Sequence, residues 1–440
     1  MVRVADTYHR MKRFLSSYGG FAGVAVAVAA LIFALNLPFV PAGDWVGHDS
    51  EWYIKMAEGR AGEVIQPFAG RFLFPTVAHW LDTYLFHDVT FAFLSLSIVS
   101  LLAFFLINAA ILKKTLKHPL LLVPLFFLPY FFLALREFFL PDVFYVFLIS
   151  LFFLSLYLER EGASLVVLFA LFLARETTAL LGLVLVVVSW LRSRKLLSVA
   201  VLVVVIISLY TSGVVSSVGA PNIHGLSTPV YLIFKFSYNF LANVFGVRLW
   251  VTGYHFCEPV SRIALPALPL LGNIREMGLC GFDASFPVST AVTLLSVFGV
   301  MPLLLFFIIF KRSIKTFLQT LKDYPFWFLV ALAYGIAQYF IGVPSGTGVQ
   351  RIVGYGWPAF LLATPFLMGK FFELDKKFIV KLSLIQLFVA WLPFFAIQKI
   401  GGYKLGYMIF SLLLILAAYL YTYRLLKKQK TITPQSIASV

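Results

Sequence analysis

The segment FAGVAVAVAALIFALNLPFV, residues 21–40, has no charged side chain and is long enough to cross a bilayer as a helix. Similar apolar runs recur to the end of the chain, and they are continuous rather than alternating. Of the 440 residues, 61% are hydrophobic and only 12% are charged, against roughly 25% charged in a soluble domain. The sequence therefore predicts an all-α, polytopic transmembrane protein with about 11–13 membrane helices, outer loops and short surface helices.

The formal charge of +16 arises from 35 basic and 19 acidic residues. We assign the basic residues to cytoplasmic loops, where they fix the orientation of membrane helices. No Lys/Arg stripe interleaved with exposed aromatic residues indicates a nucleic-acid groove, so we expect no nucleic-acid partner. A prokaryotic plasma membrane is the expected location, and the endoplasmic reticulum, with a lumenal site, is the alternative.

Basic clusters orient the chain. Both termini are predicted to be cytoplasmic, with residues 41–90 and 218–286 outside and a flexible cytoplasmic tail at 431–440. All 440 residues then belong to one membrane domain. The expected spans are 21–40, 91–112, 119–135, 142–158, 196–217, 287–310, 325–343, 353–370, 378–397 and 403–425, with a helical pair at 163–191.

The run 163–191 contains ARETT at 174–178 and is flanked by EREG and RSRK, which both indicate the cytoplasmic side. One straight span cannot have both ends on the same face. We therefore predict two short helices, 163–174 and 177–191, whose tip carries Arg175 and Glu176. The alternative is one tilted helix with an internal Arg–Glu pair.

Cys257 and Cys280 are the only cysteines, and both belong to the outer segment 218–286. A disulfide between them is expected outside the cytosol, and two free thiols are the alternative. Neither a CxxC pair nor a His/Cys metal-binding spacing occurs in the sequence.

Carboxylates, arginines and histidines from five separated segments are predicted to face the outer compartment. Ionisable groups at the membrane are costly and tend to mark function. Plainer readings stay open: neighbouring Arg–Glu pairs neutralise each other, the histidines are ordinary loop residues, and Asp142 after Pro141 is an N-cap. The residues are Asp44, His48, Asp49, Glu51, Arg71, Arg136, Glu137, Asp142, Arg175, Glu176, His224, His255, Glu258, Arg262, Gln350 and Arg351.

The motifs HDSEWYIKMAEG (48–59), GRFLFPTVAHWL (70–81), LPDVF (140–144) and ARETT resemble parts of the GT-C glycosyltransferases, membrane enzymes that use polyprenyl-phosphate-linked sugars. Asp49 and Tyr53 match the acidic residue and the aromatic residue of the family's first outer loop, and Asp142 matches its second acidic position. The resemblance covers the first half of the chain, and the second half is similar in architecture only. The family's adjacent Asp-Glu pair is here Asp49-Ser50-Glu51, which leaves open which carboxylate acts.

The resemblance implies transfer of a sugar from a polyprenyl-phosphate donor to a lipid, glycan or protein acceptor on the outer face of the membrane. Asp49 is the expected general base and Glu51 the second candidate, since the acceptor hydroxyl must lose a proton. Arg351, with Arg175 second, is expected to bind the donor phosphate. The other expected substrate-binding residues are Arg71, His48, Tyr53, Glu176 and His255.

A divalent metal ion bound by His48, Asp49 and Asp142 stays open, and the alternative is that the arginines suffice alone. A transporter or lipid flippase is the rival function, but it would bury its charges near the bilayer midplane on broken helices. Most polar residues here fall at span ends instead. A third class, a structural subunit of a membrane complex, predicts no outward cluster of carboxylates.

Overall fold

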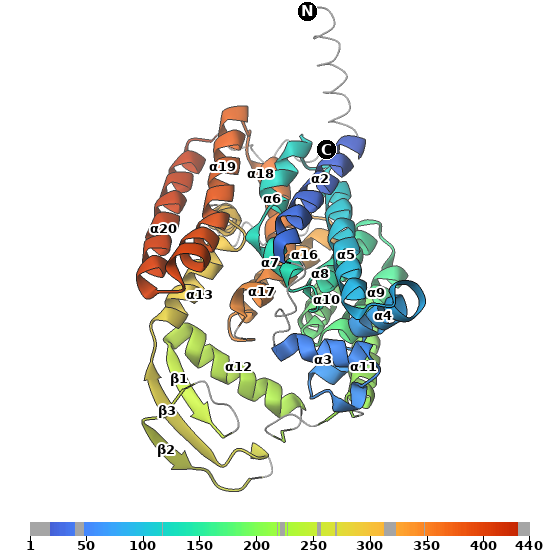
Figure 1. The fold of residues 1–440 in the computed structure, drawn as a ribbon. Helices are drawn as coiled ribbons and strands as arrows, with labels where there is room; N and C mark the ends of the chain where they lie inside the picture. The colour runs from blue at the N-terminus through green and yellow to red at the C-terminus, as the bar shows by residue number, and fades with distance from the viewer. Residues whose placement is uncertain are drawn as a thin grey trace, which may run out of the picture.

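The computed structural model describes residues 18–39, 48–116, 118–217, 219–220, 225–226, 228–252, 257–268, 271–311, 323–346 and 348–429 (Figure 1). Most of these residues are helical. The helices are α2 (Tyr18–Asn36), α3 (His48–Ala57), α4 (Leu73–Leu81), α5 (Val89–Leu112), α6 (Leu122–Phe126), α7 (Pro129–Arg136), α8 (Asp142–Tyr157), α9 (Glu161–Ala174), α10 (Thr178–Leu191), α11 (Lys195–Ser216), α12 (Thr228–Phe245), α13 (Ser285–Ser296), α14 (Met301–Lys311), α16 (Phe326–Ile341), α17 (Val349–Gly354), α18 (Thr364–Phe371), α19 (Lys376–Pro393) and α20 (Leu405–Lys427). Three π-helical turns, Asp82–Phe86 after α4, Pro358–Ala363 before α18 and Phe394–Gly401 after α19, extend their neighbours.

Five helices of the described chain are long and apolar enough to cross a membrane: α2, α5, α11, α19 with its π-helical extension, and α20. Two bent pairs, α6–α7 and α13–α14, raise the number to seven if each pair is one span. Six further apolar helices have only 10–17 residues. The predicted 11–13 membrane helices are therefore reached only when these short helices are counted.

The long helices turn apolar side chains outward. On α2, Ala25, Val28 and Ile32 are buried at helical spacing, whereas Val26 and Leu31 are exposed. Because water would make such apolar outer faces costly, they indicate contact with lipid. The chain is thus an integral membrane protein built of helices.

Helices α9 and α10 are separated at residues 175–177, as predicted. The guanidinium of Arg194, after α10, donates to the carboxylate of Glu161, at the start of α9, over 2.7 Å. The start of α9 and the end of α10 therefore lie together, and the joint between the two helices lies at the other end. This arrangement confirms the hairpin and excludes the single tilted helix.

Two expected spans, 119–135 and 287–310, are not straight. The first bends by 61° between α6 and α7, and the second by 75° between α13 and α14. At the second bend, the Gln386 side chain accepts from the Val300 amide (2.7 Å) and donates to the Phe298 carbonyl (2.9 Å). The break is tolerated because this amide side chain satisfies the freed backbone groups inside the protein.

Basic residues of two predicted cytoplasmic flanks contact residues at or just before the starts of other helices. The Lys113 ammonium lies 3.0 Å from the centre of the Tyr18 ring, and Arg192 donates to the Tyr324 carbonyl over 3.2 Å. Helices α3 and α12 lie at the opposite end from the start of α2 (Figure 1). The segments predicted to be outside are thus separated from the basic loops, as alternating spans require.

The segment 218–286 adds a small sheet to the predicted helical fold. Strands β1 (Val247–Val251), β3 (Glu276–Phe282) and β2 (Ser261–Ala264) pair antiparallel in that order. A disulfide joins Cys257 to Cys280 of β3, and this bond confirms the predicted pairing. The Asn243 side chain of α12 donates to the carbonyls of Val343 (2.7 Å) and Gly346 (3.0 Å), so α12 is tied to the loop before α17.

Candidate functional site

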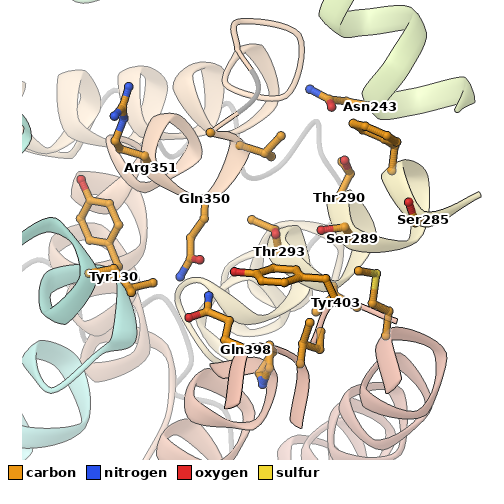
Figure 2. Close-up of a pocket in the computed structure, with 18 of the residues that line it drawn as sticks. Tyr130, Asn243, Ser285, Ser289, Thr290, Thr293, Gln350, Arg351, Gln398 and Tyr403 are labelled. Carbon is orange, nitrogen blue, oxygen red and sulfur yellow. The ribbon is translucent and has the colours of Figure 1, made fainter. Parts of the chain in front are cut away.

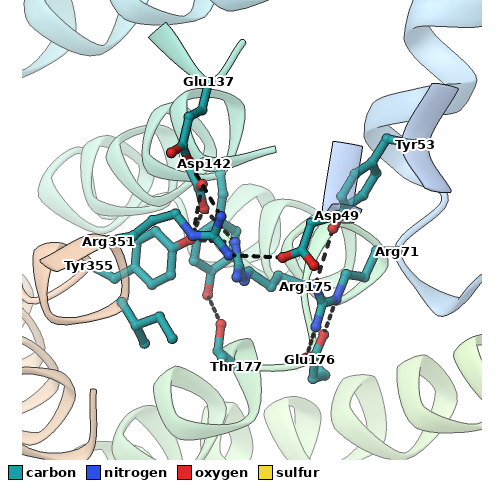
Figure 3. Close-up of polar contacts among 12 residues, drawn as sticks. Asp49, Tyr53, Arg71, Glu137, Asp142, Arg175, Glu176, Thr177, Arg351 and Tyr355 are labelled. Carbon is teal, nitrogen blue, oxygen red and sulfur yellow. Dashed lines mark hydrogen bonds and ion pairs between the residues drawn. The ribbon is translucent and has the colours of Figure 1, made fainter. Parts of the chain in front are cut away.

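Charged residues from five segments meet in one network at the end of the molecule that carries α3 and α12 (Figure 3). The segments are α3, the turn before α4, the connection from the end of α7 to the start of α8, the tip of the α9–α10 hairpin, and α17. They contribute Asp49 and Tyr53, Arg71, Glu137 and Asp142, Arg175 and Glu176, and Arg351 and Tyr355, respectively.

Asp142 is the buried centre of this network. It lies in the first turn of α8, where the helix dipole favours a negative charge. Its Oδ1 accepts from Arg175 Nη1 (2.5 Å) and from the Tyr355 hydroxyl, while Oδ2 lies 3.2 Å from Nε of Arg351. The last contact is an ion pair without hydrogen-bond alignment. Two guanidiniums thus neutralise one carboxylate that has no exposed surface.

The hairpin tip positions Arg175. This residue ends α9 in an extended conformation (φ −164°, ψ 134°), which turns its side chain toward α8 and α17. Arg175 also donates to the Tyr355 hydroxyl, and the Tyr355 ring packs edge-on against Tyr145 at 4.9 Å. Tyr145 in turn shares a 3.1 Å hydrogen bond with Thr178 of α10. These contacts lock the tip in place.

Arg71 and Glu176 form a second, forked ion pair. Arg71 Nε donates to Glu176 Oε2 over 2.7 Å, Nη2 donates to Oε1, and Nη1 donates to the Tyr53 hydroxyl over 3.1 Å. The guanidinium also covers the Phe68 ring at 4.9 Å. Burial by itself raises the pKa of Glu176, but the Arg71 guanidinium outweighs it and lowers that pKa to about 2.

Arg351 is the most accessible of the three arginines in the network. Its side chain is 23% exposed, whereas those of Arg71 and Arg175 are 7% and 5% exposed. Nη2 lies 3.5 Å from Asp49 and Nη1 lies 3.6 Å from Glu137, and both carboxylates are about half exposed. Contacts of this length are longer than a good hydrogen bond, so these partners can exchange for another anion.

Glu51 lies apart from this network. It forms an exposed ion pair with Lys55, one turn further along α3, at 2.7 Å. Because α3 begins at His48, Asp49 and Glu51 point about 200° apart around the helix axis. The side chain of His48 lies outside the described part of the chain, as do Asp44, His224, His255 and the tail 431–440.

The described residues do not fit a metal site at Asp142, which the sequence left open. Both oxygens of this carboxylate face guanidiniums, which would repel a cation. Among the residues that the structure describes, no group of three or more His, Cys, Asp or Glu side chains is placed to bind a metal ion.

A cavity of about 620 Å³ adjoins the network (Figure 2). Helices α7, α13 and α17 and the turn after α19 form its wall, and Glu137 and Arg351 belong both to its lining and to the network. The main polar lining residues are Tyr130, Arg136, Asn243, Ser285, Ser289, Thr290, Thr293, Gln350, Gln398 and Tyr403. The sequence interpretation missed the hydroxyls of α13 because their segment reads as a plain membrane span. Their spacing (289, 290, 293), which places them on one helix face, was the available signal.

The sequence interpretation also missed Lys235 of α12. Burial lowers the pKa of Lys235 and so does the nearby Arg71, whereas Glu176 and Asp49 raise it. The ammonium therefore lies close enough to both carboxylates to interact with them. Nothing in the apolar sequence around Lys235 indicates this position.

No protein-family model, curated protein or solved structure matches this chain.

Proposed function

We propose that this protein is a glycosyltransferase that moves a sugar from a polyprenyl-phosphate donor to a lipid, glycan or protein acceptor at the outer face of the membrane. The observation that carries the proposal is the 3.5 Å contact between Asp49 and Arg351. It joins an exposed carboxylate to an accessible guanidinium at the wall of a cavity. Glycosyl transfer from a lipid phosphate needs one group of each kind.

The donor phosphate replaces the carboxylate contacts of Arg351. Its 3.5 and 3.6 Å contacts with Asp49 and Glu137 are long and half exposed, whereas the contact with Asp142 is buried. A guanidinium presents forked donors that match phosphate oxygens. Phosphate binding therefore leaves Arg351 anchored on Asp142 and frees Asp49.

The freed Asp49 carboxylate accepts the proton of the acceptor hydroxyl. The acceptor oxygen bonds to the anomeric carbon as the bond from that carbon to the phosphate oxygen breaks. The electron pair leaves with the polyprenyl phosphate, whose charge Arg351 stabilises. No metal ion takes part in this sequence of steps.

Burial gives the remaining charged residues a positioning role. Arg175 and Tyr355 hold Asp142, which in turn orients Arg351. Arg71, Glu176 and Tyr53 tie α3, and with it Asp49, to the hairpin tip. From the sequence we expected Arg71, Arg175, Glu176 and Tyr53 to bind substrate. Because these side chains contact one another or Asp142, their role is to support Asp49 and Arg351.

A lipid flippase or transporter is the second candidate. The fully buried Asp142–Arg175 pair and the two broken helices favour it, since transporters place charges at such breaks. The network, however, lies at the ends of α8, α9 and α10 rather than at the bends of α6–α7 and α13–α14.

The test is sugar transfer by the purified protein in lipid nanodiscs, with polyprenyl-phosphate-linked hexoses as donors and membrane glycolipid extracts as acceptors. Transfer of label from donor to acceptor supports the enzyme. In parallel, the protein is reconstituted in liposomes and the movement of a fluorescent polyprenyl phosphate across the bilayer is measured. Movement without transfer would replace the proposal with the flippase.

A further inference from the structure

Three hydroxyls on α13 line the cavity without bonding to their own helix, whereas several other helix hydroxyls in this chain do bond to theirs. The side chains of Ser150 and Ser296, for example, donate to carbonyls of their own helices over 3.0 and 2.7 Å. Such bonds to the preceding turn are the usual way to satisfy a helix hydroxyl in an apolar setting. The side-chain hydroxyls of Ser289, Thr290 and Thr293 make no hydrogen bond to any described residue, although all three side chains line the cavity.

Two side-chain amides in the cavity wall also lack a hydrogen-bond partner in the described part of the protein. Gln350 of α17 and Gln398 after α19 have no hydrogen-bond partner among the described residues. By contrast, the amides of Gln338 and Gln386 bond to backbone groups. Figure 2 shows Gln350 and Gln398 on the side of the cavity where Thr293 and Tyr403 project. These polar groups face the cavity and have no partner among the residues that the structure describes, so a ligand that enters the cavity can hydrogen-bond to them.

The chemistry of these groups specifies the ligand. Hydroxyls and amides both donate and accept, as sugar hydroxyls do. The charged lining residues are Arg136, Glu137 and Arg351, which come from the end of α7 and from α17, and the α13 side is neutral. The cavity volume of about 620 Å³ falls within the range of roughly 300–1,000 Å³ for small-molecule sites.

We infer that this cavity is a binding site for a neutral, hydroxyl-rich sugar, held by Ser289, Thr290, Thr293, Gln350 and Gln398. This inference rests on the proposed function in taking the bound sugar to be a substrate unit next to Arg351. A uronic acid or an amino sugar whose charged group faced α13 would meet only neutral groups there, away from Arg136, Glu137 and Arg351, which is unfavourable. The site therefore selects neutral sugars over charged ones.

Thiol protection tests the site without any sugar transfer. The two cysteines of the chain are joined in a disulfide, so Thr293→Cys provides one free thiol. In nanodiscs made without glycolipids, methyl glucoside, mannoside or galactoside should slow its reaction with N-ethylmaleimide. The reaction should be about tenfold slower when the sugar concentration is about nine times its Kd. Methyl glucuronide and glucosamine at the same concentration should leave the rate unchanged.

Ala61→Cys, on an exposed outer turn, is the matched control, and its labelling should not respond to any sugar. In the Thr293→Cys protein, Thr290→Val should weaken the binding of the protecting hexoside about three- to tenfold, as loss of one hydrogen bond predicts. Thr211→Val removes a hydroxyl that bonds to the Ile207 carbonyl of its own helix, and it should have no effect on protection. Absence of protection, or equal protection by neutral and charged sugars, would overturn the inference.

The two proposals fail separately in these experiments. Protection by neutral hexosides in a protein that transfers no sugar would retain the cavity site and reject the glycosyltransferase. Transfer with no protection at Thr293→Cys would retain the enzyme and reject the cavity as its sugar site.

Discussion

Arg71 and Glu176, 105 residues apart in the sequence, form a forked ion pair that ties the turn before α4 to the tip of the α9–α10 hairpin. Both nitrogens of the fork are matched by one carboxylate, and a third nitrogen of Arg71 bonds to Tyr53 of α3. The position of α3 therefore depends on the hairpin. Since Asp49 belongs to α3, this contact also sets where Asp49 meets Arg351.

Removing one partner of this pair should be costly. Glu176→Gln leaves the Arg71 guanidinium buried without its counterion, so we expect a loss of about 3–5 kcal/mol in the free energy of unfolding. Melting temperature in detergent measures the effect. The control is Glu63→Gln, which breaks an exposed ion pair with Arg60 and should cost less than about 1 kcal/mol. Equal melting temperatures for the two variants would contradict the structural role of Glu176.

The stabilising effect of Glu176 should depend on pH in a defined window. The pKa of Glu176 is lowered to about 2 in the folded protein, because Arg71 outweighs the effect of burial, and it is about 4.3 in an unfolded chain. A depressed pKa stabilises the fold above the unfolded value, and this stability is lost as the pH falls through the folded value.

The melting-temperature difference between wild type and Glu176→Gln should thus stay constant from about pH 7 to pH 5 and shrink between about pH 4 and pH 2. Circular dichroism across this range gives the comparison. A difference that already shrinks near pH 6 would show that another group is responsible.

The sequence predicted the parts of this arrangement that follow from local pattern and charge. The basic flanks of residues 163–191 required a hairpin, and α9 and α10 form one. Carboxylates and arginines placed at span ends were expected on one side, and Asp49, Asp142 and Arg351 do meet there.

The sequence did not predict features that depend on distant contacts. The bend at 297–300 is stabilised by Gln386 of α19, so no local signal marks it. The small sheet pairs β3 with strands on both sides through backbone bonds, and its segments show weak alternation. The cavity lies where α7, α13 and α17 come together. The sequence of any one of these helices does not predict their contact with the other two.

Arg351→Lys should weaken donor binding. Lysine keeps the charge but loses the planar fork, so a phosphate receives one point contact instead of two aligned hydrogen bonds. We expect the Kd for a polyprenyl-phosphate sugar to rise about tenfold, the equivalent of one charge-assisted hydrogen bond. Binding to the detergent-solubilised protein can be followed by microscale thermophoresis.

The control for this substitution is Arg194→Lys, which alters a partly exposed pair with Glu161 at the other end of the molecule. Its donor affinity should match wild type. If Arg351→Lys also binds with wild-type affinity, Arg351 is not the phosphate ligand, and Lys235 becomes the next cation to test.

Asp49→Asn should separate binding from chemistry. The amide keeps the size of the carboxylate and removes its basicity, so the variant should fold and still bind the donor. Transfer should fall by about 10²-fold or more, the usual contribution of a general base. Glu51→Gln is the matched control, because Glu51 points away from Arg351 and pairs with Lys55. It should transfer sugar at nearly the wild-type rate. If Glu51→Gln loses transfer activity and Asp49→Asn keeps it, Glu51 is the general base. Retention in both would remove the catalytic base from α3 altogether, and the acidic cluster after the first membrane span would then serve only to hold Arg351 in place.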